Sequence, residues 1–134
     1  MSAWYHVYIK NHTTYDFMYM EGFVRPAATL FGDTASWNRA PDDIKSQLGA
    51  IDNNAYAFDC KGSNGCEGSA IYAILDTEEN TKIGTLKLNW LVRAIGSSSV
   101  SASVDSDAVR ITRDDRDEQG MEEVVHHVEV KQGI

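Results

Sequence analysis

The chain lacks a long apolar segment, an excess of positive charge and a catalytic signature. No stretch approaches the ~18 apolar residues that a membrane-spanning helix needs. The formal net charge is −8. This argues against nucleic acid as a partner, because proteins that bind phosphate backbones gather Lys and Arg. No nucleophile elbow, zinc-protease motif, phosphate-binding loop or dinucleotide fingerprint is present. The sequence therefore predicts a protein that is not an enzyme.

Export signals and cysteines are also scarce. The first ten residues, MSAWYHVYIK, show no basic segment followed by an apolar one, so we expect no secretory signal. The two cysteines, Cys60 and Cys66, either form a small disulfide worth roughly 2 kcal/mol or remain free thiols. No histidine accompanies them, and the neighbours His126 and His127 point to opposite faces of a strand. We therefore predict no metal and no cofactor.

Length and periodicity indicate a single all-β domain over residues 1–134. A hydrophobic content of 43% is enough for a packed core. Alternation of apolar and polar residues marks strands, and the turns between them recur at regular spacing. We count seven to nine short strands and predict an antiparallel β-sandwich. The strand-like ranges are 4–10, 15–23, 55–58, 69–75, 83–92, 97–104, 109–112 and 124–131.

Three local features carry further expectations. The first two strand-like ranges are separated by the turn residues Asn-His-Thr-Thr, which predicts a hairpin. Pro41 and the acidic pair that follows it predict the start of a short helical turn at 42–48, ended by glycine. The glycine-broken stretch 60–68 and the acidic stretch 114–123 are typical of solvated loops.

Several short motifs occur in one order along the chain. They are A-W-x-x-x-x-I-x-N at residues 3–11, C-x-x-S-x-x-x-E-G at 60–68, Trp90 after the next strand, a serine-rich stretch and V-K-Q-G-I at the end. Together they resemble the aegerolysin family from end to end. Two departures stand out. The Cys-Pro-Trp-Gly stretch that often follows the family's equivalent of Trp90 is replaced by V-R-A-I-G. Another family tryptophan falls at Arg25–Pro26.

The resemblance implies a β-sandwich that binds membrane sphingolipids and has no enzymatic activity. The family's targets are ceramide phosphoethanolamine and sphingomyelin with cholesterol. Members often act with a second protein, of the membrane-attack-complex/perforin type, to make a pore. The resemblance thus implies the lipid-recognising part of a two-component cytolysin. Such a protein is secreted without a classical signal peptide and is peripheral on target membranes.

Five residues are candidates for the lipid site. The resemblance assigns lipid choice to Glu67 and membrane contact to Trp4, and it matches Trp90 to the start of an aromatic loop. The glycines beside Glu67 would let an ammonium group approach the carboxylate. Tyr72 or Trp90 would add cation–π attraction of ~1 kcal/mol. Trp37, in a polar segment, is a further membrane or partner contact. The three tryptophans also have a packing interpretation, and Glu67 could simply solvate a turn.

Two other functions remain open. A carbohydrate-binding lectin of the β-sandwich type would use a Trp or Tyr platform with Asn, Asp and Glu around it. A protein that acts through protein contacts alone would need neither a lipid nor a sugar. Binding to vesicles and to glycans separates these alternatives.

Overall fold

The regular structure of the chain is made of strands. The computed structural model describes residues 2–28, 32–48, 55–118 and 122–133, and none of these residues lies in a helix. No helix that could cross a membrane occurs among them. The predicted all-β class is confirmed. The strands are β1 (Ala3–His12), β2 (Asp16–Pro26), β3 (Ala35–Arg39), β4 (Tyr56–Gly62), β5 (Gly65–Asp76), β6 (Thr81–Arg93), β7 (Ser99–Val104), β8 (Val109–Glu118) and β9 (Glu123–Gln132).

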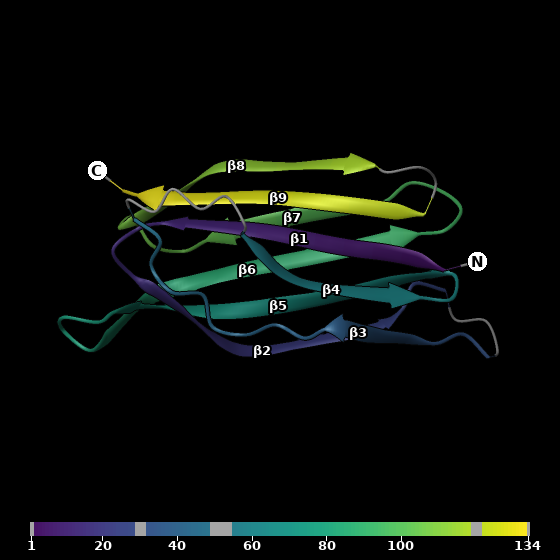
Figure 1. Cartoon of the computed structure of the whole chain (residues 1–134), viewed down its shortest axis with the longest axis horizontal. Coiled ribbons are helices and arrows are strands. Elements are labelled where there is room, and N and C mark those ends of the chain that lie inside the picture. Colours follow the sequence, from purple (N-terminus) through teal and green to yellow (C-terminus); the bar gives the residue numbers. More distant parts are fainter. Residues whose placement is uncertain (1, 29–31, 49–54, 119–121, 134) are drawn as a thin grey trace.

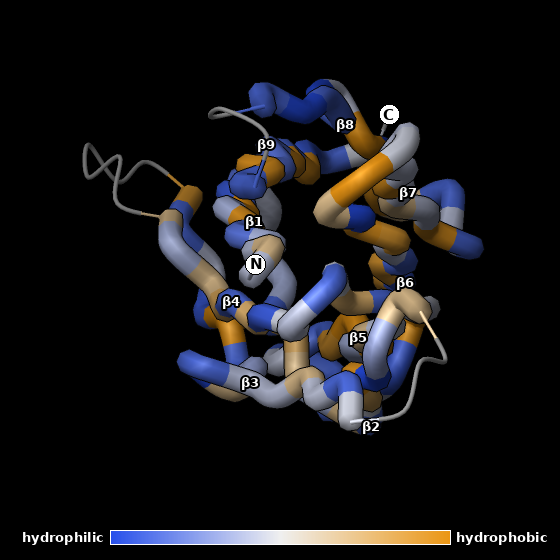
Figure 2. Tube along the Cα trace, turned by 90° about the vertical axis from the view of Figure 1, so that its right-hand side faces the viewer, coloured by the Kyte–Doolittle hydropathy of each residue, from blue (hydrophilic) through white to orange (hydrophobic). Residues whose placement is uncertain are grey.

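The strands form two sheets that pack as a sandwich. The five-stranded sheet has the order β3-β4-β1-β9-β8, and the four-stranded sheet has the order β2-β5-β6-β7 (Figure 1). Viewed along the strands, the two sheets face each other as layers (Figure 2). The central pair β1–β9 is parallel. The other strand pairs of the described residues are antiparallel.

The core lies between the sheets and follows the alternation in the sequence. Tyr5, Val7 and Ile9 on β1 are at most 1% exposed, whereas the residues between them are half-buried on the outer face. The same period places Leu86, Leu88 and Trp90 of β6 inside. Burying an aliphatic or aromatic side chain of this size is worth about 1.5–3 kcal/mol. Across the layers, the Tyr5 and Trp90 rings stack with centroids 4.5 Å apart.

The predicted hairpin between the first two strands is wrong. β1 pairs with β4 and β9 in one sheet, whereas β2 pairs with β5 in the other. Both strands direct apolar residues into the same core. They therefore lie in opposite sheets that face each other and not side by side in one sheet. The turn residues between β1 and β2 therefore carry the chain from one sheet to the other.

The predicted helical turn at 42–48 is also wrong. Ile44 forms a bridge with Phe17 of β2, and each backbone N–H donates to the other residue's carbonyl at 2.8 Å. Asp43 accepts a hydrogen bond from the backbone N–H of Tyr19 at 2.8 Å. The partly buried Ile44 side chain packs on the core, and this tertiary contact outweighs the local helix-start signal.

Two stretches expected to be loops belong largely to strands. Residues 60–62 end β4 and residues 65–68 begin β5, so the glycine-rich stretch is a tight connection between two strands. Residues 114–118 complete β8, which is an edge strand of its sheet. Most of its exposed side chains are charged because one face and one edge of β8 meet solvent, and this composition conceals the strand in the sequence.

Cys60 and Cys66 are free thiols, which answers the question that the sequence leaves open. Both are fully buried, and their Sγ atoms lie 3.4 Å apart. Cys60 belongs to β4 and Cys66 to β5, so the two thiols meet between the sheets. The hydrogen bond with Cys66, together with burial, raises the pKa of Cys60, which keeps the thiol protonated.

Candidate functional site

The outer face of the four-stranded sheet carries a row of unlike side chains near one end. Arg25 of β2 faces Glu67 of β5, which faces Leu91 of β6, which in turn faces Ser99 of β7. Because residues in register on one face lie about 5 Å apart, this row crosses the sheet as a continuous strip. It brings a cation, an anion, an apolar group and a hydroxyl together from four strands.

A second row runs parallel to the first, two residues further along each strand. It consists of Phe23, Ser69, Asn89 and Ser101. Phe23 is 46% exposed, so part of its ring is open to solvent. This row adds an aromatic ring, an amide and two hydroxyls, all suited to hydrogen bonding or to packing against a small polar molecule.

Between the two rows the surface is hollowed to about 320 Å³. Gly68 forms part of its floor, and a Cβ at that position would lie 2.6 Å from Cζ2 of Trp90. The absence of a side chain at Gly68 therefore lets the Trp90 ring pack directly beneath the strand that forms the floor of the hollow. The lining residues are Phe23, Arg25, Glu67, Gly68, Asn89, Trp90, Leu91, Ser99, Val100 and Ser101.

Charge at the hollow is concentrated in one ion pair. The Nε of Arg25 donates to Oε1 of Glu67 at 2.5 Å, with side-chain exposures of 62% and 31%. The Arg25 guanidinium also lies 5.4 Å from the centre of the Phe23 ring, within cation–π range. The hollow thus presents a positive and a negative group side by side, both accessible to solvent.

The predicted site residues do not form one pocket. Glu67 lines the hollow, and Trp90 contributes to its floor although the residue is only 3% exposed. Tyr72 is fully buried, so its ring offers no face to a ligand, and the expected cation–π contact from it is wrong. Trp37 packs edge-on against Phe58 and Trp90, which agrees with its interpretation as a packing anchor.

Trp4 lies on the outer face of the other sheet. Its indole stacks on His6 with centroids 5.5 Å apart, and the Lys61 ammonium lies 5.1 Å from the ring centre. It is therefore separated from Glu67 by the whole thickness of the sandwich. Both residues nevertheless lie close to the same end, because Trp4 pairs with Lys61 just before the β4–β5 turn and Glu67 follows that turn.

Another exposed apolar residue marks this end of the sandwich. Ile95 is 82% exposed in the β6–β7 turn, which joins two strands that line the hollow. The backbone N–H of Ala94 donates to the carbonyl of Asn64 at 3.4 Å, so the β6–β7 and β4–β5 turns meet.

Sequence reasoning missed Arg25, Asn89 and Ile95 as site residues. For Arg25 the available signal was the departure from the family pattern at that position.

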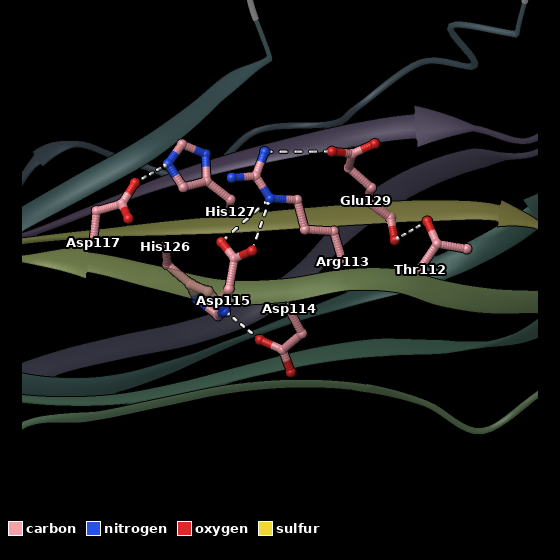
Figure 3. Close-up of polar contacts among 8 residues, drawn as sticks. All are labelled: Thr112, Arg113, Asp114, Asp115, Asp117, His126, His127 and Glu129. Carbon is pink, nitrogen blue, oxygen red and sulfur yellow. Dashed lines mark hydrogen bonds and ion pairs between the residues drawn. The ribbon is translucent and has the colours of Figure 1, made fainter.

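A second polar cluster lies within the core and beside it. His126 is fully buried; its Nε2 donates to Asp114 Oδ1 at 2.6 Å, and its Nδ1 accepts from the Tyr5 hydroxyl at 2.7 Å (Figure 3 shows the Asp114 contact). Burial lowers the pKa of His126 against the opposing effect of Asp114. Burial also raises the pKa of Tyr5 well above its usual value. Tyr5 and His126 have no exposed surface, and of the three residues only Asp114 reaches solvent.

The outer face of the five-stranded sheet carries ion pairs. His127 pairs with Asp117 at 3.2 Å, and Arg113 contacts both Asp115 and Glu129, as Figure 3 shows. Among the residues that the structure describes, no three His, Cys, Asp or Glu side chains are grouped to hold a metal ion. The hollow on the four-stranded sheet is therefore the best candidate for a functional site.

Comparison by sequence finds no matching protein family and no matching curated protein. Among solved structures, the chain is similar to the one described as "Crystal structure of RahU protein in complex with TRIS molecule", with 12% identity and a TM-score of 0.41. The match covers 99% of this chain and 96% of that chain. At this TM-score the similarity carries no argument about function, so the function is inferred from the geometry of the hollow.

Proposed function

We propose that the protein binds the headgroup of a membrane lipid in the hollow between the two rows. The observation that carries the proposal is the exposed Arg25–Glu67 pair at the edge of a hollow of about 320 Å³. A lipid headgroup that carries a phosphate beside an ammonium has the charges to meet both groups. Carboxylates and guanidinium groups form the stronger, charge-assisted class of hydrogen bonds with such partners.

The position of the hollow suits a membrane surface. It lies near the end of the sandwich that also carries Trp4 and the 82% exposed Ile95. With this end toward a bilayer, Ile95 would enter the apolar layer and Trp4 would lie at the headgroup level, where indoles are enriched. The net charge of −8 disfavours general attraction to anionic lipids, so binding depends on specific headgroup contacts.

The resemblance to the aegerolysins supports the finer form of the proposal. The lipid would be a sphingolipid, either ceramide phosphoethanolamine or sphingomyelin with cholesterol. The protein would be secreted, peripheral on the target membrane and the lipid-recognising component of a pore made with a perforin-type partner. Without that partner we expect binding and no lysis.

A lectin is the second candidate, and one observation favours it. Ser69, Asn89 and Ser101 form a hydroxyl and amide row beside the exposed ring of Phe23. Sugars are commonly held by such groups beside an aromatic ring. The same surface would then bind a glycan through the second row, with little dependence on Glu67.

Co-sedimentation with vesicles tests the proposal. We expect pelleting with vesicles that contain ceramide phosphoethanolamine or sphingomyelin with cholesterol, and none with phosphatidylcholine alone. Glu67→Ala should weaken binding by ~1–3 kcal/mol, the scale of a lost charge-assisted contact. Glu129→Ala is the matched control, because Glu129 also pairs with an arginine, at 3.5 Å, on the opposite sheet.

The alternatives predict different results in the same experiment. Retention on a glycan array without pelleting would replace the lipid proposal with the lectin. Binding of neither vesicles nor glycans would favour a protein that acts through protein contacts. Equal affinity of the Glu67→Ala and Glu129→Ala variants for vesicles would exclude Glu67 from the binding site.

A further inference from the structure

The carboxylate at the hollow already has a partner of its own. Arg25 stands directly opposite Glu67 in the β2–β5 ladder, and its Nε–H is bonded to Oε1 at 2.5 Å. A simple cation that enters the hollow must compete with a guanidinium attached to the neighbouring strand. Because the Arg25 guanidinium is attached to the neighbouring strand, it competes for Glu67 at an effective concentration of about millimolar order. Unlike a free cation, it loses no translational freedom when the pair forms.

The same guanidinium keeps donors for a ligand. In the part of the chain that the structure describes, its only hydrogen bond is the one from Nε to Glu67, and the side chain is 62% exposed. The terminal nitrogens therefore keep donors that no described residue engages. A planar guanidinium fork matches two oxygens of one phosphate, which a lysine ammonium does not.

We propose that Arg25 determines the specificity of the hollow by acting as an internal counter-ion of Glu67. It excludes ligands that are only cationic and admits ligands that carry a phosphodiester beside their ammonium group. This inference rests on the proposed function and adds a residue that the sequence motifs do not contain. The ammonium approaches the exposed side of Glu67, while the phosphate takes the terminal nitrogens of Arg25.

The position of Phe23 supports this role. Its ring lies 5.4 Å from the Arg25 guanidinium carbon and lines the hollow beside it. The ring thereby limits the directions in which the guanidinium can turn, and its negative face adds to the attraction. A phosphate then meets a group that is already oriented, which reduces the entropy lost on binding.

A purely structural role for Arg25 predicts something different. Exposed ion pairs contribute little to stability, so Arg25→Ala should fold normally. If Arg25 only supported the fold, its removal would weaken the binding of every ligand together. If it is the counter-ion of Glu67, its removal should change the affinities for two ligand classes in opposite directions.

The experiment measures binding of two soluble probes by NMR titration, choline as a bare cation and glycerophosphocholine as a phosphodiester zwitterion. In the wild type, glycerophosphocholine should bind more tightly. Arg25→Ala should strengthen choline binding several-fold and weaken glycerophosphocholine binding roughly tenfold or more, the scale of a lost bond between charged groups. Arg25→Lys should still exclude choline, while binding the zwitterion less tightly than wild type.

Arg110→Ala is the matched control, because it removes the same charge from β8 in the other sheet. It should leave both affinities unchanged. Parallel titrations with vesicles separate this inference from the proposed function. Lipid binding stands if wild type binds vesicles and Glu67→Ala does not. In that case, an unchanged ratio of the two probe affinities in Arg25→Ala overturns only the role of Arg25. If wild type binds neither probes nor vesicles, both are overturned.

Discussion

His126 and Asp114 connect the buried core to the edge where the two sheets meet. Nε2 of His126 lies 2.6 Å from Oδ1 of Asp114, and Oδ2 of the same carboxylate accepts from the backbone N–H of Ala102 in β7 at 3.1 Å. β7 and β8 are edge strands of different sheets. Asp114 therefore accepts a hydrogen bond from a backbone N–H on the free edge of β7. On this side of the sandwich the two sheets are thus joined by a side chain and not by pairing between β7 and β8.

Loss of this carboxylate should destabilise the fold. Asp114→Ala leaves the buried Nε2–H of His126 without a protein acceptor, and leaving such a group unsatisfied costs about 1–3 kcal/mol. Urea denaturation followed by circular dichroism measures the change in the free energy of unfolding. Asp117→Ala is the control, since Asp117 holds the partly exposed His127 at 3.2 Å and should matter by less than about 0.5 kcal/mol. Equal effects of the two substitutions would contradict this role.

His126 should also make stability depend on pH. Burial lowers its pKa in the folded protein below the ordinary value of 6.5. As the pH falls through ~6.5, the unfolded chain therefore binds a proton that the folded protein does not, and stability decreases toward the lowered pKa. Above ~6.5 this contribution is complete. The slope contributed by one such group is at most ~1.4 kcal/mol per pH unit.

Denaturation of wild type and His126→Gln between pH 7.5 and pH 5 measures this slope. The variant should be less stable at pH 7.5 but should lose less stability on acidification. His127→Gln, one position along the strand and on the outer face, should keep the contribution of His126. An identical slope in wild type and His126→Gln would assign the acid sensitivity to other groups.

Strand identity could be predicted where one face of a strand is buried. Alternation predicted that Tyr5, Val7 and Ile9 share one face of a strand and that Leu86 and Leu88 face the core, and the structure confirms both. Strand pairing could not be predicted, because β1 takes its neighbours β4 and β9 from distant parts of the chain. Local patterns specify which side chains are buried, whereas the register depends on contacts between distant segments.

The candidate site could be predicted only in part for the same reason. The Glu67–Gly68 step stands out in the sequence, and it does line the hollow. Arg25 and Asn89 lie far from it along the chain and reach it only through the β2–β5–β6 register. Tyr72 was expected to offer a ring face to a ligand, but its position in β5 turns it toward the core, whereas the burial of Trp90 agrees with its packing interpretation.

Gly68 should tolerate no side chain. A Cβ at this position would overlap the carbonyl oxygen of Phe23 and would lie 2.6 Å from Cζ2 of Trp90. Because the backbone of β2 cannot move away freely, Gly68→Ala should lower the free energy of unfolding by about 1–3 kcal/mol, as overpacking does. Calorimetry or urea denaturation measures the loss. Ser69→Ala, the next residue on β5, removes only a partly exposed hydroxyl and should stay within about 0.5 kcal/mol of wild type.

Membrane binding should depend on which exposed apolar residue is changed. Ile95, 82% exposed, lies in the β6–β7 turn at the end that carries the hollow. Leu48, 57% exposed, lies near the other end, because the backbone N–H of its neighbour Gln47 donates to the carbonyl of Asn11. Asn11 lies eight positions along β1 from Ala3, which corresponds to roughly 26 Å along the strand.

Ile95→Ser and Leu48→Ser therefore form a matched pair. Both remove an exposed apolar side chain, so both should leave the free energy of unfolding nearly unchanged. Ile95→Ser should weaken vesicle binding by up to about 1.5–3 kcal/mol, the value of burying an apolar side chain of this size, whereas Leu48→Ser should bind as wild type does. Vesicle co-sedimentation at several lipid concentrations measures both affinities. Weaker binding of Leu48→Ser with unchanged binding of Ile95→Ser would mean that the opposite end of the sandwich faces the membrane.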